Sequence, residues 1–384
     1  MEKQEKITKK NKGKQSGSKL NLGTKQNDEC YTAMQDILDE LVHWAKLDKF
    51  RNKNIICPCD WDIVEGEEIY SITITYKEDG IEILGNNVYK AVKSVCYDLW
   101  SNDPEPIVTK INLKENEIED FLRDKLTCNF VRTFVQNARA WGIKSITASG
   151  YNPANKKGTP FQNIDYSKYD ICVTNPPFSL YGEFMTAIVG HIDFIVLAPF
   201  MNRANPCIGL PLMLKQAYLG YSGNNEAGYL ALNFNNPTVE NKYHTKKVAC
   251  DWITSFDNAQ QERNSKHWKS GVKYEIYKDE YINMTDMPMK DGTFPIRVPS
   301  DAFPEDYDGW MFTPVNVLNK LDETYEWYIT NCKGYLNAHP EINPLNQAAT
   351  DKMVANPLTG KGFHGVLFRK KLAKENNNEQ TRSN

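Results

Sequence analysis

The sequence predicts an α/β fold with a mainly parallel, doubly wound sheet, and three observations indicate this class. Short apolar segments alternate with segments of helical periodicity from residue 27 to about residue 198, which is typical of parallel sheets covered by helices. One apolar segment, residues 169–174, stops abruptly at Asn175-Pro176-Pro177-Phe178, and ligands bind at the carboxyl ends of strands in such sheets. The 384 residues suffice for one large domain or two of ordinary size.

The first predicted elements are a helix and a strand. Within residues 27–50, Leu38, Leu41 and Ala45 recur at helical spacing. Residues 54–60 form a short apolar run that ends in an aspartate. We expect this run to be the first strand of the sheet.

Residues 63–127 predict an inserted α+β block. A hairpin-like stretch at residues 69–76 precedes an Asp79-Gly80 turn and a second apolar stretch, and helical patterning follows at residues 88–100. The block carries fourteen Asp and Glu against seven Lys and Arg. We therefore do not expect it to lie along phosphates, and its role as a lid, a partner surface or a clamp stays open.

The strand–helix alternation resumes at residue 129 and completes a main domain at residues 27–215. Phe130 and Phe134 are spaced as on one face of a helix. The further predicted elements are strands at 145–148, 169–174 and 191–198 and a helix at 180–189.

The remaining segments have a different character. Residues 216–374 are aromatic, polar and irregular, with short β-like runs, and we interpret them as a C-terminal recognition region. Residues 1–26 carry eight lysines and two glutamates without any aromatic residue, so a disordered basic arm is expected. The arm either adds affinity for phosphates or only solubilises the chain, and residues 375–384 are expected to be a disordered tail.

Composition excludes several classes of protein. With 40% hydrophobic residues, a mean hydropathy of −0.59 and no long apolar run, the chain is expected to have no membrane span and no signal peptide. Its nine cysteines lie largely in apolar segments, which favours reduced thiols and a cytoplasmic location. Cys57 and Cys59 have no second pair to complete a zinc site, so no metal is expected.

The Asn175-Pro176-Pro177-Phe178 turn suits methylation of an exocyclic amino group on a planar ring. Two consecutive prolines cannot continue a sheet ladder and restrict the residue before them. The Asn175 side-chain oxygen and the Pro176 carbonyl could accept both amino hydrogens, and Phe178 could stack on the ring. A tight proline turn that merely caps a buried strand is the alternative interpretation.

The order of motifs resembles the EcoRI-type adenine-specific DNA methyltransferases over most of residues 27–330. Asn175–Phe178 is similar to motif IV of amino-methyltransferases. The other segments similar to the family are 27–32, 55–60, Cys128-Asn129-Phe130, 251–257 and 304–314. Unlike most methyltransferases, the 55–60 element has no Gly-x-Gly loop, so Pro58 and Asp60 must shape that turn differently.

This resemblance implies a Rossmann-like class I methyltransferase whose catalytic domain, residues 27–215, uses S-adenosylmethionine. It also implies an adenine N6 acceptor that is flipped out of double-stranded DNA. Asn175, Pro176, Pro177 and Phe178 would be catalytic. The cofactor-binding candidates are Tyr31, Thr32, Pro58, Asp60 and Asp165.

Each cofactor candidate has a structural alternative. Tyr31 could pack in the core while Thr32 caps a helix, Asp60 could be a surface residue at a strand end, and Asp165 could be an exposed loop aspartate. Trp252 and Trp268 could support a flipped base or simply be packed.

The expected partners are double-stranded DNA and, where the enzyme is half of a restriction–modification pair, a restriction endonuclease for the same site. A bacterial or phage origin and a monomeric state fit this interpretation. A catalytically inactive DNA-binding relative, or a methyltransferase for RNA or a protein glutamine amide, is the alternative function.

Overall fold

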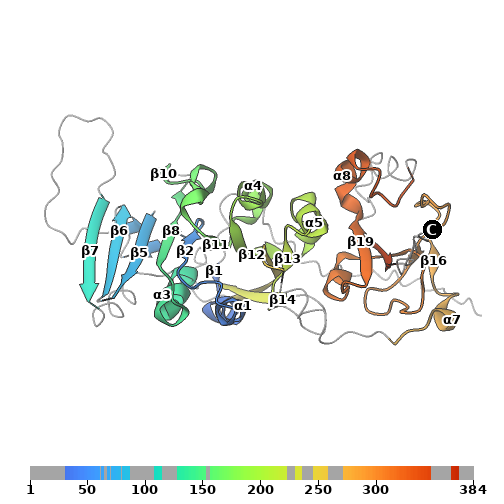
Figure 1. Cartoon of the computed structure of the whole chain (residues 1–384), viewed down its shortest axis with the longest axis horizontal. Helices are drawn as coiled ribbons and strands as arrows, with labels where there is room; N and C mark the ends of the chain where they lie inside the picture. The colour runs from blue at the N-terminus through green and yellow to red at the C-terminus, as the bar shows by residue number, and fades with distance from the viewer. Residues whose placement is uncertain are drawn as a thin grey trace, which may run out of the picture.

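The structure is a computed structural model that describes residues 31–60, 62–64, 67–69, 71–78, 80–86, 108–114, 128–152, 156–222, 230–235, 245–257, 271–346 and 365–371. The molecule is elongated, with a long sheet toward one end and a smaller sheet at the other (Figure 1). The predicted basic arm, the C-terminal tail, the helical pattern at 88–100 and Trp268 lie outside the described residues.

The large sheet has eleven strands in the order β1-β14-β15-β12-β11-β2-β8-β5-β6-β7, with β13 paired to β15. Its strands are β1 (Tyr31–Thr32), β2 (Asn54–Cys57), β5 (Ser71–Lys77), β6 (Gly80–Asn86), β7 (Val108–Lys114), β8 (Ser145–Ser149), β11 (Ile171–Thr174), β12 (Asp193–Pro199), β13 (Tyr218–Leu219), β14 (Leu230–Asn235) and β15 (Thr245–Thr254). Two small hairpins lie outside it, β3 (Asp62–Val64) with β4 (Glu67–Ile69) and β9 (Tyr151–Asn152) with β10 (Lys157–Gly158).

Only the centre of this sheet is parallel. Strands β12, β11, β2 and β8 pair parallel with one another. Strands β5, β6 and β7 on one side and β14 and β15 on the other add to this centre by antiparallel pairing. The expectation of a mainly parallel sheet is therefore wrong for the sheet as a whole. The physical reason is that strands close in sequence, such as β5 and β6, join by short turns, which permit antiparallel pairing only.

Helices cover both faces of the parallel centre, as the two hydrophobic cores show. Helices α1 (Met34–Lys46) and α3 (Asn129–Trp141) pack in one core, and α4 (Tyr181–Ile188) and α5 (Pro206–Met213) pack in the other. Strand β2 serves both cores, because Ile55 belongs to the first and Ile56 to the second, as the pleat requires. Figure 1 shows the two helix pairs on opposite sides of the sheet.

The elements with clear periodicity were predicted well. The strand expected at 145–148 is β8, the strand at 191–198 overlaps β12, and the helix at 180–189 is α4. The expected hairpin around Gly80 is β5–β6. Strand β11 begins at Ile171, two residues later than expected, because the Tyr169 backbone N still donates to the Tyr166 carbonyl and closes the preceding 3₁₀ turn.

The smaller sheet begins only at Ile282. Its order is β16-β17-β18-β20-β19, and its strands are β16 (Ile282–Asn283), β17 (Ile296–Arg297), β18 (Met311–Thr313), β19 (Tyr325–Ile329) and β20 (Val366–Lys370). Helices α7 (Tyr274–Tyr277) and α8 (Lys333–Ala338) accompany it. Because β13, β14 and β15 still belong to the large sheet, that sheet continues beyond residue 215, where the sequence predicted the main domain to end.

Short 3₁₀ turns connect many of these elements. They are η1 (Phe161–Asn163), η2 (Tyr166–Lys168), η3 (Phe178–Leu180), η4 (Phe200–Ala204), η5 (Val315–Asn319) and η6 (Thr330–Cys332). In the part of the chain that the structure describes, none of the helices is both long and apolar enough to cross a membrane.

A buried carboxylate anchors helix α1 to the edge of the large sheet. Glu40 is fully buried, and its Oε1 accepts hydrogen bonds from Trp44 Nε1 at 2.9 Å and from the Tyr221 backbone N at 3.0 Å. Its Oε2 accepts from the Ser222 backbone N at 2.6 Å. The carboxylate thus satisfies the turn that follows β13, as a buried charge requires.

Gly220, at this turn, is expected to tolerate no larger residue. A methyl group there would lie 2.4 Å from Glu40 Oε1 and 2.4 Å from Trp252 Cβ, so Gly220→Ala should lower the free energy of unfolding by about 1–3 kcal/mol. Urea denaturation measures the loss. Gly334→Ala is the matched control, because nothing lies within 4 Å of its added methyl group; an equal loss in both variants would contradict the prediction.

Candidate active site at the carboxyl edge of the sheet

Two of the predicted site residues, Asp60 and Asn175, lie where the order of the parallel strands reverses. The chain passes from β2 to β8 on one side and then returns to place β11 on the other side of β2. In open α/β sheets, this reversal leaves a crevice at the carboxyl ends of the two strands, where ligands bind. Asp60 follows β2, and Asn175 follows β11.

The Asp60 carboxylate ties these strand ends together. Its Oδ2 accepts a hydrogen bond from Thr174 Oγ1 at 2.6 Å, which spans the reversal point. Its backbone N donates to the Ser149 carbonyl at 3.0 Å, at the end of β8. Asp60 is 8% exposed, so its role as a surface residue does not fit the structure.

The N-terminus of helix α3 lies beside the same carboxylate. Cys128, the residue before the helix, donates from Sγ to Asp60 Oδ1 at 3.4 Å. The positive end of the helix dipole favours negative charge at this place. Both carboxylate oxygens of Asp60 therefore accept a hydrogen bond from a neighbouring side chain.

The proline turn is held between the two cores. Pro176 is buried and Asn175 is half-buried, while the Phe178 side chain packs against both hydrophobic cores. Leu180 N donates to the Pro177 carbonyl at 3.0 Å and closes the η3 turn, so the turn uses the Pro177 carbonyl and not that of Pro176. The Asn175 amide and the Pro176 carbonyl therefore sit on a stiff corner.

Tyr31 and Thr32 form β1, which pairs with the end of β14 at Asn235 and Phe234. The Thr32 carbonyl accepts from Asn129 Nδ2 at 2.8 Å, which links β1 to the helix that begins beside Asp60. Thr32 is 2% exposed, and its Oγ1 is buried without a hydrogen-bond partner among the described residues. The structure thus places Thr32 next to the α3 N-terminus rather than at a helix cap.

Of the two remaining candidates, the structure brings only Pro58 to the site. Pro58 is buried directly after β2. Asp165 is exposed, and its Oδ1 accepts from Ser167 Oγ at 2.6 Å and from Ser167 N at 3.3 Å at the start of η2. These bonds, with Lys168 beside the carboxylate, lower the pKa of Asp165.

Two buried thiols lie in the strands that lead to this edge, Cys57 in β2 and Cys172 in β11. Burial, followed by neighbouring acidic groups, raises the pKa of Cys57 and of Cys172 well above the ordinary 9.0. Both thiols are therefore protonated at neutral pH, which excludes them as thiolate nucleophiles there. The described residues contain no cluster of three or more His, Cys, Asp or Glu suited to a metal.

These thiols predict a loss of stability at alkaline pH. A raised pKa in the folded state contributes stability that is present below the unfolded value and is lost as pH rises through the folded value. The free energy of unfolding should fall by up to about 1.4 kcal/mol per pH unit for each thiol above about pH 9. Urea titrations from pH 7 to 10 measure this slope, and a slope unchanged in Cys57→Ala/Cys172→Ala would contradict it.

Sequence reasoning missed Thr174 and Cys128 as partners of Asp60. Thr174 immediately precedes the proline turn and Cys128 precedes a helix, but no spacing in the chain signals a contact across 114 or 68 residues. The structure also decides between the two interpretations of Trp252. Trp252 is fully buried and packs edge-on against Phe130 at 6.1 Å, so it does not contact DNA.

One family of known proteins is similar to this chain over most of its length. A family model described as "Adenine-specific methyltransferase EcoRI" matches residues 20–356. No curated protein and no solved structure gave a match.

Proposed function

This chain belongs to the family of the adenine-specific methyltransferase EcoRI and is therefore an adenine-specific DNA methyltransferase, and we propose that it methylates N6 of an adenine flipped out of a specific duplex site. The methyl donor in this proposal is S-adenosylmethionine, and transfer is direct, without a covalent enzyme intermediate. The observation that carries the proposal is the hydrogen bond between Thr174 and Asp60. It joins the strand end that carries Asn175 to Asp60, the candidate cofactor residue at the end of β2.

The fold proposal is a Rossmann-like, doubly wound core. In chain order, the four parallel strands lie as second, first, third, fourth (β8, β2, β11, β12), an order found in doubly wound folds with a ligand site between the first and third strands. Helices on both faces support it. The antiparallel strands on either side extend this core.

The residues at the edge fit the chemistry of the proposed cofactor. Asp60 would accept hydrogen bonds from its amino group, and the N-terminus of α3 would favour its carboxylate. Thr32 offers a buried hydroxyl that has no hydrogen-bond partner among the described residues. When bound, S-adenosylmethionine supplies an electrophilic methyl group on a sulfonium.

The Asn175 corner would prepare the acceptor amine. An adenine amino group is a weak nucleophile because its lone pair is conjugated into the ring. Hydrogen bonds from that group to the Asn175 side-chain oxygen and the Pro176 carbonyl would favour a pyramidal nitrogen. Phe178 would hold the ring plane, and stacking of this kind contributes about 1–3 kcal/mol per base, which helps to offset base extrusion.

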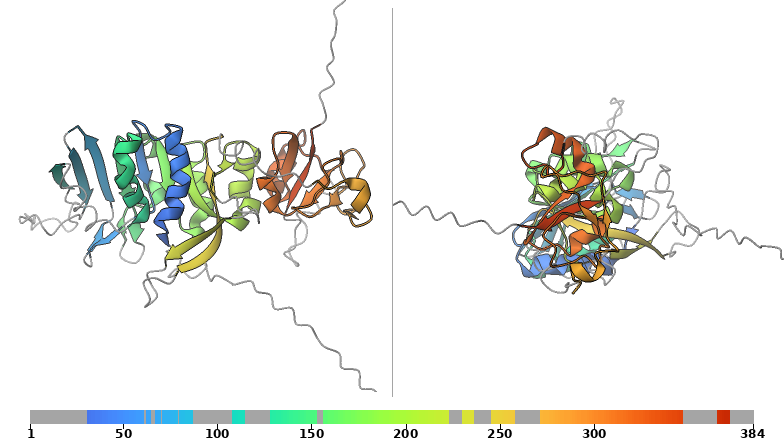
Figure 2. Two further views of the ribbon diagram at one scale, coloured as in Figure 1. Left: turned by 90° about the horizontal axis from the view of Figure 1, so that it is seen from below. Right: turned by 90° about the vertical axis from the view of Figure 1, so that its right-hand side faces the viewer.

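The ribbon of β14 and β15, which β1 joins at Asn235 and Phe234, is the proposed DNA contact at this edge. Strand β15 pairs with β12 only as far as Cys250, opposite Pro199 at the carboxyl end of β12. Residues 245–249 continue beyond that end and pair with β14, so the ribbon overhangs the edge that carries Asn175. It projects from the body in Figure 2, and it includes Lys246 and Lys247.

Arg369, in β20, makes its contacts within the protein. Its guanidinium pairs with Glu326 and lies 4.3 Å from the centre of the Trp310 ring. We propose the smaller-sheet unit, residues 271–346 and 365–371, as the recognition region, without assigning Arg369 to phosphate.

Long-read methylation sequencing of DNA from cells that express the protein tests this function. The expected result is N6-methyladenine in one sequence context, absent from cells that express Asn175→Ala. Modified cytosine, or no modified DNA base from protein that binds S-adenosylmethionine, would reject the proposal and favour an RNA or protein substrate.

A further inference from the structure

A buried arginine joins the two sheets of the molecule. Arg203 lies in η4, is fully buried, and forms an ion pair with Asp251 of β15 in the large sheet. Its Nη1 donates to Asn319 Oδ1 at 2.9 Å. Asn319 is the last residue of η5, which directly follows β18 of the smaller sheet, and it is 4% exposed.

This arginine bridge lies close to the Asn175 corner. Asp251 is opposite Ala198 in the β12–β15 register, and η4 begins directly after β12 ends. In the neighbouring pair, Thr174 of β11 is opposite Val196 of β12. The bridge therefore sits at the carboxyl end of β12, one strand away from the end that carries Asn175.

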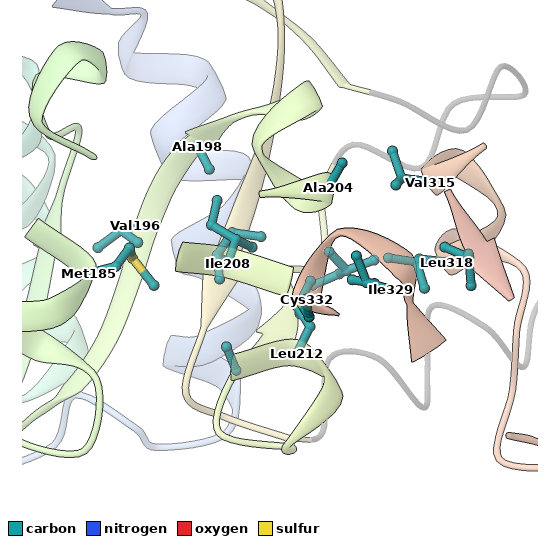
Figure 3. Packing of buried hydrophobic residues seen from close by; sticks show 14 of the residues in the cluster. Met185, Val196, Ala198, Ala204, Ile208, Leu212, Val315, Leu318, Ile329 and Cys332 are labelled. Carbon is teal, nitrogen blue, oxygen red and sulfur yellow. The ribbon is translucent and has the colours of Figure 1, made fainter. Parts of the chain in front are cut away.

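An apolar contact surrounds the bridge. Ala204, Ile208 and Leu212 of η4 and α5 pack in one core with residues of the smaller-sheet unit (Figure 3), which are Val315, Leu318, Ile329 and Cys332. The Ile329 backbone N also donates to Met213 Sδ at 3.2 Å. At Gly209, an added methyl group would lie 3.1 Å from Ile329 Cδ1, so the two surfaces approach closely.

The apolar contact and the buried ion pair contribute differently to the junction between the two units. Apolar burial holds surfaces together without direction. A buried ion pair adds little net stability over apolar residues of similar volume, but in some proteins it selects one arrangement among several. The planar guanidinium can bond two partners only in a defined geometry. Arg203 meets one partner in each unit, so its bonds are satisfied in one relative orientation.

We propose that Arg203, with Asp251 and Asn319, is a positioning device that fixes the smaller-sheet unit relative to the Asn175 corner. This inference rests on the proposed function, in which that unit contacts the DNA target. Bases read by the unit then determine which adenine reaches the corner. Loss of the bridge would leave the units attached by the apolar contact but free to shift.

Two variants and one control test the bridge in the full-length protein. Asn319→Leu removes the hydrogen bond that Arg203 makes to the smaller-sheet unit. Arg203→Met/Asp251→Leu replaces the ion pair by apolar residues and leaves no unpaired charge. Asn316→Ala is the control, because Asn316 lies in the same turn but donates from Nδ2 to Ser300 Oγ at 2.6 Å within its own unit.

The first measurement is discrimination, the ratio of kcat/KM for the cognate site to that for sites with one changed base pair. We expect both bridge variants to lose about 10- to 100-fold in this ratio, since displacements near 1 Å have effects of this size. The control should keep the ratio. If the apolar double variant melts like the wild type and keeps full discrimination, the bridge is merely structural and the inference is wrong.

The second measurement does not depend on activity. Amide hydrogen exchange should become faster in segments 206–213 and 315–332 of both bridge variants, with β2 and β11 unchanged. Unaltered exchange in these segments would overturn the positioning role. If the wild-type protein methylates no DNA, the proposed function fails, whereas the exchange result still decides whether the bridge orders the two units.

Discussion

Replacing Asn175 by alanine is expected to reduce the rate of DNA methylation by about 10³-fold, while affinity for S-adenosylmethionine changes less than about threefold. The amide oxygen is the proposed acceptor for one amino hydrogen of the target adenine. Its loss removes an interaction that matters in the transition state, and single groups of this kind contribute about 10²–10³-fold. Cofactor affinity should persist because the bonds of Asp60 to Thr174 and Cys128 do not involve the Asn175 side chain.

Single-turnover methylation and isothermal titration with the cofactor measure the two effects separately. Ser179→Ala is the matched control, since Ser179 is exposed in the same turn. A rate within about tenfold of the wild type would discredit the acceptor role. Joint loss of rate and cofactor affinity would instead indicate that the alanine disrupts the edge.

Asp60→Asn is expected to have the opposite pattern, with cofactor affinity falling by about 10- to 100-fold. Asparagine keeps the size of the side chain and an oxygen for the Thr174 hydroxyl, but it loses the negative charge. Hydrogen bonds to charged groups contribute about 1.5–3 kcal/mol, and each 1.4 kcal/mol is tenfold in affinity. At saturating cofactor, the methylation rate should largely recover.

Asp170 provides the matched carboxylate at the other end of the same two strands. It precedes β11, and its Oδ2 accepts from the Asn54 backbone N at 2.8 Å, at the start of β2. Asp170→Asn should therefore weaken folding without changing cofactor affinity. Equal losses of affinity in the two variants would show that Asp60 acts only by holding the strands together.

The sequence predicted those parts of the fold that depend on interactions between residues close together in the chain. Phe130 and Phe134 recur at helical spacing, and both are buried on one face of α3. The apolar run before Asn175 is a fully buried strand, and the prolines end it because they cannot donate to the ladder. Asp60 was predicted at a strand end from its position after an apolar run.

Other features depend on which strands become neighbours. The added strands at both sides of the sheet pair antiparallel, and β13 to β15 extend it beyond residue 215. Asp165 and Asp60 were both cofactor-binding candidates, yet Asp165 is exposed and bonds to Ser167, whereas Asp60 is buried. Local pattern does not distinguish an aspartate buried between strand ends from one in a surface turn.

The sequence by itself determined the proline corner, the alternation of strands and helices around it and, through its motifs, the methyltransferase family. Only the tertiary structure decided that Thr174 meets Asp60 and that Arg203 joins Asp251 to Asn319. The physical reason is the distance along the chain over which each kind of interaction acts. Periodicity and turn chemistry act over a few residues, whereas these pairings form only after burial of two apolar faces has set the order of the strands.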